Sequence, residues 1–146
     1  MGIEPEKIAE LRVKHLEMVQ AVVARMANHG ATLKNWCITV TAAACGFAIT
    51  LQRPLVALLG LLPITIFALL DAQYLRAERR FRALFERLRC EDWGTFPSFE
   101  ISLNTAPQIA YGSVLCSWSI FNFYAPLALG VVIVMLIAGY VYGRII

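Results

Sequence analysis

Histidine and cysteine are the residue types in this chain that could bind a metal ion or act as nucleophiles. His15 and His29 are fourteen residues apart, about 21 Å along a helix, which is too far to share one metal ion. The cysteines are scattered, two of them within an apolar run, and suit packing better than metal binding: Cys37, Cys45, Cys90 and Cys116. The sequence contains no phosphate-binding glycine loop, Cys-x-x-Cys pair or serine elbow. We therefore expect no catalytic residue, no metal, no cofactor and no enzymatic activity.

Arginine is the residue type here that could bind an anionic ligand, because the guanidinium group matches the geometry of a phosphate. Arg12 and His15 lie on the first predicted helix, and Arg79 and Arg80 lie on a later one. Packed together, these two helices would bring the four side chains into a cytoplasmic pocket for an anion such as a nucleotide signal. The alternative interpretation is a His15 packed in the core and arginines that are solvated at the surface.

Long stretches without charge divide the charged residues into two blocks, which indicates a membrane protein. Of the 146 residues 59% are hydrophobic, and the mean hydropathy of +0.64 is high for a soluble domain. We predict an all-α membrane protein with three transmembrane helices, at Asn35 to Gln52, Pro54 to Leu70 and about 122 to 144. A soluble bundle is the alternative, but three buried apolar helices would leave too few charges to coat it.

Two helices outside the predicted spans are expected to form a small cytoplasmic bundle. The first is amphipathic, runs from Pro5 to about Asn28 and has Gly30 as its C-terminal cap. The second continues the second span, so that one helix runs from about 54 to 89. The apolar residues expected to face each other are Ile8, Leu11, Leu16, Met18, Val19, Val22, Val23 and Met26 on the first helix, and Tyr74, Leu75, Phe81, Leu84, Phe85 and Leu88 on the second.

The segment between the second and third spans breaks the helical pattern. Residues 91 to 104 are predicted to be a short extended segment and a loop, which only a neighbouring subunit or a partner could pair as a strand. Residues 107 to 124 are predicted to form a separate interfacial helix, because Pro126 suits the first turn of the helix that follows. The predicted units are therefore a cytoplasmic helix (1–30), a transmembrane hairpin (31–71), a cytoplasmic helix with loop and interfacial segment (72–121) and a third transmembrane helix (122–146).

The distribution of positive charge predicts the orientation in the membrane. Eleven lysine and arginine residues lie before the first span or between the second and third, and two others are Arg53 and Arg144. By the positive-inside rule, the N-terminus lies in the cytoplasm and the C-terminus lies outside. Acidic residues nearly balance the positive charge within each block, which argues against nucleic-acid binding.

Small and weakly polar residues within the spans predict self-association, since they let helices approach closely in lipid. The candidates for helix packing or for lining a pore are Thr39, Ala42, Gly46, Thr50 and Asn122. Three helices cannot enclose an aqueous path, so a pore would require a homo-oligomer. The absence of a charged residue at mid-span argues against the proton relays of pumps and coupled transporters.

Several strings of this sequence are similar to a group of short bacterial membrane proteins. They are Met26-Ala-Asn-His-Gly, Leu33-Lys-Asn-Trp36, Leu70-Asp-Ala-Gln-Tyr-Leu-Arg-Ala-Glu-Arg-Arg, Phe99-Glu-Ile-Ser-Leu-Asn-Thr-Ala-Pro107 and Ser117-Trp-Ser-Ile-Phe-Asn-Phe-Tyr124. The group resembles the SLATT-type membrane effectors of bacterial anti-phage systems. That resemblance implies an inner-membrane location, oligomerisation, and loss of membrane integrity after a nucleotide or protein signal. Because the chain shows no separate sensor domain, a ligand site would have to be built from the cytoplasmic helices or supplied by a partner.

These observations together predict a homo-oligomeric effector or channel-like protein that perturbs the bacterial inner membrane when it is triggered, and the resemblance implies a role in phage defence. The alternative from another class is a membrane anchor or assembly subunit, whose helix from Arg76 to Arg89 recruits a soluble cytoplasmic partner. A membrane enzyme subunit is a third and weaker alternative.

Overall fold

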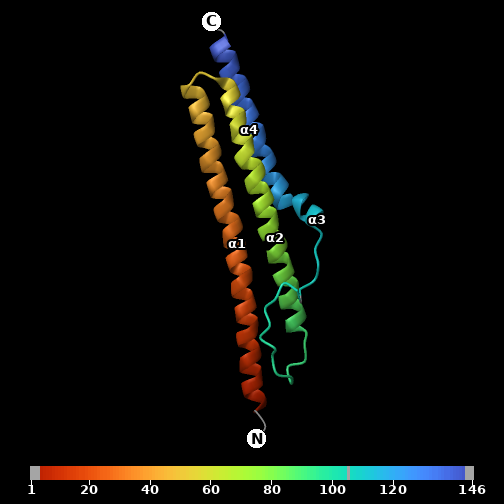
Figure 1. Ribbon diagram of the computed structural model, residues 1–146. Coiled ribbons are helices and arrows are strands. Elements are labelled where there is room, and N and C mark those ends of the chain that lie inside the picture. Colours follow the sequence, from red (N-terminus) through yellow and green to blue (C-terminus); the bar gives the residue numbers. More distant parts are fainter. Residues whose placement is uncertain (1–3, 105, 144–146) are drawn as a thin grey trace.

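The computed structural model describes residues 4–104 and 106–143 of the chain. Every regular element within these residues is a helix. Figure 1 shows the helices in one elongated bundle, in which α1 begins at one end and α4 finishes at the other. The molecule is therefore long and thin, so that one half of its length can be polar and the other half apolar.

Helix α1 is a single helix of 46 residues, Pro5–Thr50, about 69 Å long. The prediction that Gly30 caps a separate N-terminal helix is wrong. A glycine cap requires a left-handed backbone conformation, whereas no described glycine has a positive φ, and Gly30 is buried in the middle of α1. The N-terminal segment and the first apolar run are thus one rigid element.

The chain reverses direction at residues 51–53. Gln52 adopts a left-handed backbone with φ of 54°, and the Arg53 amide donates a hydrogen bond to the Ala48 carbonyl at 3.1 Å. The return path is a 3-10 helix, η1 (Pro54–Gly60), followed directly by α2 (Leu61–Arg89). The prediction of one helical run from 54 to 89 is confirmed, with a tighter helix in its first turns.

Helices α1 and α2 lie side by side and antiparallel (Figure 1). Near the N-terminus of α1, Val19 packs in an apolar cluster with Phe81 and Leu84 of α2, so the two predicted faces do meet. The buried side of α1 is rotated from the predicted stripe, however. Arg12 is buried, whereas Met18 is 48% exposed.

Residues 90–110 connect α2 to the next helix and fold back along the bundle (Figure 1). The described residues of this connecting segment contain neither helix nor strand. Arg80 of α2 donates a hydrogen bond to the Pro107 carbonyl at 3.1 Å, and Arg76 donates to the Ile109 carbonyl at 2.7 Å. No strand forms among the described residues of this segment, and side chains of the chain's own helices also bind its backbone at Thr95 and Leu103. Pairing with a neighbouring subunit or a partner stays a prediction.

The prediction of one separate helix at 107–124 is wrong. The structure has a short helix, α3 (Tyr111–Leu115), and then α4 (Trp118–Gly143), which includes the predicted third span as far as residue 143. Residue 144 lies outside the described residues. The Ser117 carbonyl accepts hydrogen bonds from the amides of Ile120 and Phe121, so α4 begins there. Pro126 lies inside α4 rather than in its first turn, since one missing amide hydrogen bond is tolerated in a helix with neighbours.

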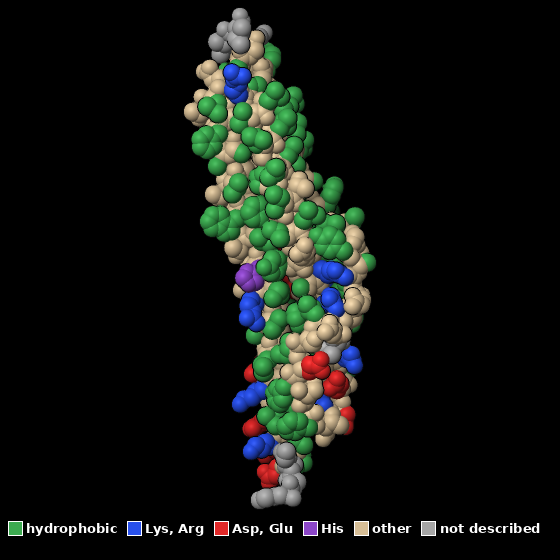
Figure 2. All heavy atoms as spheres, in the orientation of Figure 1, with side chains coloured by type: hydrophobic (Ala, Val, Ile, Leu, Met, Phe, Trp, Pro, Cys, Tyr) green, Lys and Arg blue, Asp and Glu red, His purple; other side chains and the backbone are tan. Residues whose placement is uncertain are grey.

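Two helical runs among the described residues are long and apolar enough to cross a membrane, Pro54–Arg89 and Trp118–Gly143. Each contains an 18-residue window with a mean hydropathy of 2.3, of which only 28% and 17% is buried. A core helix of a soluble protein would be mostly buried. Figure 2 shows the same division on the surface, with charged side chains over the half that contains the N-terminus and hydrophobic ones over the other half.

The contacts of Arg12 predict that it holds the first part of the connecting segment on α1. Its Nε donates to the Thr95 carbonyl at 2.8 Å, and its Nη1 lies 3.3 Å from the Glu91 carboxylate. We expect Arg12→Met to raise amide hydrogen exchange in residues 91–99 by about tenfold, because charge-assisted hydrogen bonds are lost. Hydrogen-exchange mass spectrometry measures this.

Arg82→Met is the matched control, since Arg82 is 64% exposed and paired with Glu78 on its own helix. This variant removes the same charge and should leave exchange in residues 91–99 unchanged. Equal exchange in wild type and Arg12→Met would show that the segment is held by other contacts.

Candidate functional site

An ion pair lies inside the bundle where the charged half meets the apolar half. Lys34 of α1 and Asp71 of α2 approach to 3.3 Å between Nζ and Oδ2. The Asp71 side chain is 5% exposed and that of Lys34 is 26% exposed. A carboxylate at such depth requires a counter-charge, so Lys34 and Asp71 bind the two long helices to each other at this level.

Gly30 makes this close approach of the helices possible. A Cβ atom at position 30 would lie 3.0 Å from Oδ1 of Asp71, tighter than ordinary van der Waals contact. A larger side chain would displace the carboxylate from Lys34, one turn further along α1. The glycine that sequence reasoning assigned to a helix end therefore has a packing role in the middle of a helix.

Helix α4 contributes to the same site. The Lys34 ammonium donates a hydrogen bond to Oγ of Ser119 at 3.3 Å. It also lies 5.8 Å from the centre of the Phe123 ring, within range of a cation–π interaction. One lysine thus contacts both other long helices, and a shift of any of them would change its interactions.

A cavity of about 200 Å³ adjoins the ion pair. It opens among α1, α2 and the start of α4, and its lining residues are Met26, Ala27, Gly30, Ala31, Lys34, Asp71, Leu75, Glu78 and Ser119. On the other side of the pair lies an apolar cluster that includes Cys37, Ile64 and Tyr124. The pair therefore marks the boundary between a cavity lined in part by charged side chains and an apolar core.

Sequence reasoning did not single out this pair, although a signal was present. Lys34 lies eighteen residues before Gln52, and Asp71 lies eighteen residues after Arg53. In a helical hairpin that turns at residues 52 and 53, two residues at equal distance from the turn lie at the same level. The predicted hairpin therefore already indicates that Lys34 and Asp71 lie opposite each other.

The residues predicted to bind an anionic ligand divide into two groups in the structure. Arg12 and His15 lie together under the connecting segment, where Arg12 bonds to Thr95 and the His15 ring packs at 5.4 Å from that of Phe99. Both are at most 5% exposed. Arg12 and His15 therefore hold the segment in place.

Arg80 lies elsewhere, bound to the carbonyl oxygens of Leu103, Ala106 and Pro107. Arg82 lines one groove with Gln20 and Val23 of α1, and Arg12 is eight residues before Gln20, about 12 Å along α1. Arg12 and Arg80 are thus at different levels of the bundle. The structure does not bring them, or Arg79 beside Arg80, into one pocket with His15.

The predicted packing or pore residues of α1 share one face of that helix. Thr39, Ala42, Gly46 and Thr50 are all exposed, and their spacing of three or four residues places them in one line, opposite the side that α1 buries. The hydroxyls of Thr39 and Thr50 donate to carbonyl oxygens of the preceding turn, at 3.0 and 2.9 Å. Asn122 is exposed as well, but it lies on α4.

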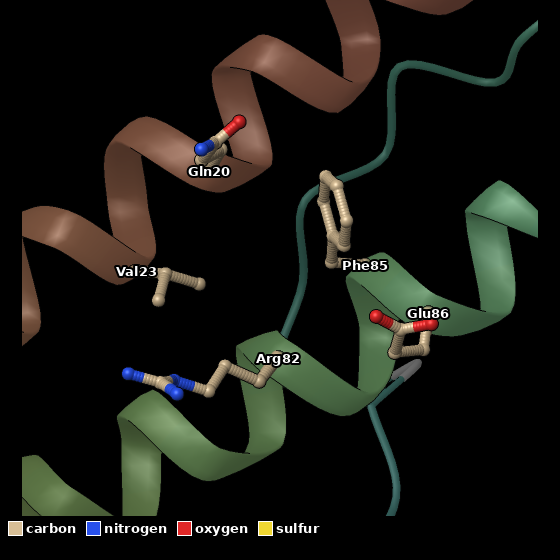
Figure 3. Close-up of a pocket in the computed structure, with 5 residues that line it drawn as sticks. All are labelled: Gln20, Val23, Arg82, Phe85 and Glu86. Atoms are coloured by element: carbon tan, nitrogen blue, oxygen red, sulfur yellow. The ribbon is translucent and has the colours of Figure 1, made fainter.

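A groove between α1 and α2 opens on the charged half of the bundle. It measures about 490 Å³, and Figure 3 shows its lining side chains, which are Gln20, Val23, Arg82, Phe85 and Glu86. The groove contains one cation, one acid and one aromatic ring, which together match the mixed polar and apolar surface of a peptide. A phosphate would be repelled by the acid. This groove is therefore the feature that favours a soluble protein partner.

Within residues 4–104 and 106–143, no three His, Cys, Asp or Glu side chains are placed to hold a metal ion. All four cysteines are free thiols, of which Cys37 is buried. The chain matches no protein-family profile, no curated protein and no solved structure. The function of this chain is therefore proposed from the geometry of its helices.

The ion pair predicts a strong energetic coupling between its two residues. Lys34→Met leaves Asp71 buried without a counter-charge, and Asp71→Asn leaves the lysine unpaired. We expect each single variant to lose about 1–3 kcal/mol of stability, with partial recovery in the double variant and a coupling energy of about 1 kcal/mol or more. Thermal unfolding in detergent, followed by circular dichroism, measures all three variants.

Arg89→Gln provides the control, because the Arg89–Glu86 pair is about 60% exposed at both side chains. Its loss should cost less than about 0.5 kcal/mol. Strictly additive effects of Lys34→Met and Asp71→Asn would show that the two side chains do not depend on each other.

Proposed function

We propose that this protein is a membrane-embedded, homo-oligomeric, channel-like effector whose cytoplasmic layer controls its membrane-spanning layer. One observation carries the proposal. Helices α1 and α2 run without a break from the charged half of the bundle into the apolar half, and Lys34 and Asp71 join them where the halves meet. A shift imposed on the charged half would therefore be transmitted along rigid helices into the bilayer.

Large apolar side chains at the surface support a membrane location. Within the apolar half, the residues that are more than half exposed are Trp36, Phe47, Leu51, Leu55, Leu59, Leu62, Trp118, Phe121, Leu129, Leu136, Ile137 and Tyr140. So much exposed apolar surface is unfavourable in water, at roughly 25 cal/mol per Å². A lipid bilayer removes this cost, and Trp36 and Trp118 would lie at its interface.

The residues of α1 from Asn35 to Thr50 are proposed as a third span. This segment lies beside the two apolar runs, and the hydroxyls of its outward-facing Thr39 and Thr50 donate to carbonyl oxygens within the helix. At the far end, the Tyr142 hydroxyl donates to the Ile49 carbonyl at 2.9 Å, which ties α4 to α1. Three spans with the observed charge asymmetry give a cytoplasmic N-terminus and a periplasmic C-terminus in a bacterial inner membrane.

Cysteine labelling tests this orientation. In a protein with Cys37, Cys45 and Cys116 replaced by alanine, the remaining Cys90 should react with a membrane-impermeant maleimide only after the inner membrane is opened. With Cys90 also replaced, a cysteine introduced by Gln52→Cys should react in spheroplasts with an intact membrane. The reverse pattern would contradict the proposed topology.

The exposed face of α1 supports self-association. Its line of small and weakly polar residues, from Asn35 through Thr39 and Gly46 to Thr50, faces away from the protomer's own helices. Close approach of a second copy in lipid is favoured by small side chains and by hydroxyls. In a ring of copies, Asn35, Thr39 and Thr50 would line the path, whereas Asn122 would contribute from α4 only if α4 also faced the interface.

Gly46→Leu tests the association face. A Cβ atom at position 46 meets nothing within 4 Å in the protomer, so the substitution should leave the protomer intact and obstruct only a second copy. We expect crosslinked oligomer in lipid to fall roughly threefold to tenfold. Dye uptake and depolarisation of expressing cells should fall with it.

Gly130→Leu is the matched control. Gly130 also lies in an apolar helix with nothing within 4 Å of a Cβ atom, and both changes raise helix propensity equally. Wild type and both variants migrating alike, or a stable monomer that never depolarises cells, would contradict the proposed oligomeric effector. Expression with the neighbouring genes tests the phage-defence setting that the resemblance implies.

A membrane anchor or assembly subunit is the second candidate, and the groove in Figure 3 favours it. The groove at Gln20, Phe85 and Glu86 lies on the half that would face the cytoplasm. An anchor would bind a soluble protein there and would leave membrane potential unchanged. The depolarisation measurement therefore separates the two candidates.

A further inference from the structure

A second groove lies between α2 and the connecting segment, close to the proposed membrane boundary. It measures about 470 Å³, and its lining residues are Gln73, Arg76, Ala77, Arg80, Leu103 and Tyr111. Two guanidinium groups line it, and no acidic side chain does. The cavity at Asp71 and the groove at Glu86 both contain an acid, so this groove has the environment best suited to an anion.

The two arginines are held in place by the backbone of the connecting segment. Arg76 uses its Nε to donate to the Ile109 carbonyl at 2.7 Å, and Arg80 uses its Nε to donate to the Pro107 carbonyl. No hydrogen bond between described residues uses the Nη atoms of Arg76 or Nη1 of Arg80. These N–H groups are donors for a further acceptor, on side chains whose direction is already fixed.

The position of the groove relates it to the lipid headgroups. If Asp71 marks the end of the hydrocarbon region, Arg76 lies about 7 Å and Arg80 about 13 Å beyond it along α2. The headgroup region extends about 5 to 8 Å from the hydrocarbon, which places Arg76 at the level of the headgroups and Arg80 about one turn of α2 further out. The Tyr111 hydroxyl donates to the Leu69 carbonyl at 2.9 Å, which holds one wall of the groove at this same boundary.

We propose that this groove binds the phosphate of an anionic phospholipid. Arg76 and Arg80 donate to the phosphate oxygens, and Leu103 and Tyr111 form an apolar wall beside the glycerol and the first carbons of the acyl chains. The inference rests on the proposed membrane location, but it does not depend on oligomerisation or on channel activity. Inorganic phosphate in solution is also an anion that two arginines could bind. The experiment must therefore distinguish binding of a phospholipid from binding of inorganic phosphate.

Gln73→Glu is the variant that tests the site. Gln73 is exposed and lines the groove, so the variant adds a negative charge there while leaving the hydrogen bonds of both arginines in place. Native mass spectrometry of the detergent-extracted protein would count bound phosphatidylglycerol and phosphatidylcholine. We expect wild type to prefer phosphatidylglycerol, and Gln73→Glu to bind it about fivefold more weakly.

Gln20→Glu is the control, since it makes the same change at an exposed residue of the other groove. It should bind phosphatidylglycerol as wild type does. Equal binding of both lipids by wild type, or an equal loss in both variants, would overturn the proposed site. Displacement of bound phosphatidylglycerol by millimolar inorganic phosphate would overturn the assignment to lipid.

Membrane extraction before this assay separates the two proposals. A chain recovered in the soluble fraction would contradict the membrane location itself. A chain that requires detergent, and yet shows no preference for phosphatidylglycerol, contradicts the headgroup site alone.

Discussion

A carboxylate buried inside a helical bundle requires a positive partner, and this requirement sets the arrangement of the three long helices. Asp71 can be buried because Lys34 lies opposite, and Lys34 can reach it because Gly30 lets α1 approach α2. Ser119 of α4 binds the same ammonium group. The register of α1 against α2, and the level at which α4 begins, both follow from these contacts.

Arginine side chains organise the charged half of the molecule in a different way. Arg12 of α1 and Arg76 and Arg80 of α2 all bind backbone oxygens of the connecting segment. A segment without regular structure has many carbonyl groups to satisfy, and the guanidinium group is the side chain with most donors. The segment thereby covers both helices, and in the proposed function a ligand or partner that moved it would act on both at once.

The apolar half has little internal polarity, so its outer surface decides its behaviour. Most of α4 and η1 presents large apolar side chains. The outward face of α1 also has large ones at its sides, such as Trp36 and Phe47, but Thr39, Gly46 and Thr50 form a line of small or weakly polar residues along its middle. The first kind of surface suits lipid chains, and the second suits another helix. This asymmetry is the physical basis for placing the proposed interface between copies on α1.

The sequence alone determined the helical character, the turn at residues 52 and 53, and the continuous run from 54 to 89. These features depend on local periodicity and on charge along the chain, which are readable without contacts. Tertiary structure decided that Gly30 continues a helix, that α4 begins before Pro126, and that Arg12, His15 and Arg80 bind the connecting segment at two separate levels. Each of these three features depends on a contact with a residue that is distant in the sequence. A glycine can end a helix or admit a close contact, and only the position of Asp71 selects between them.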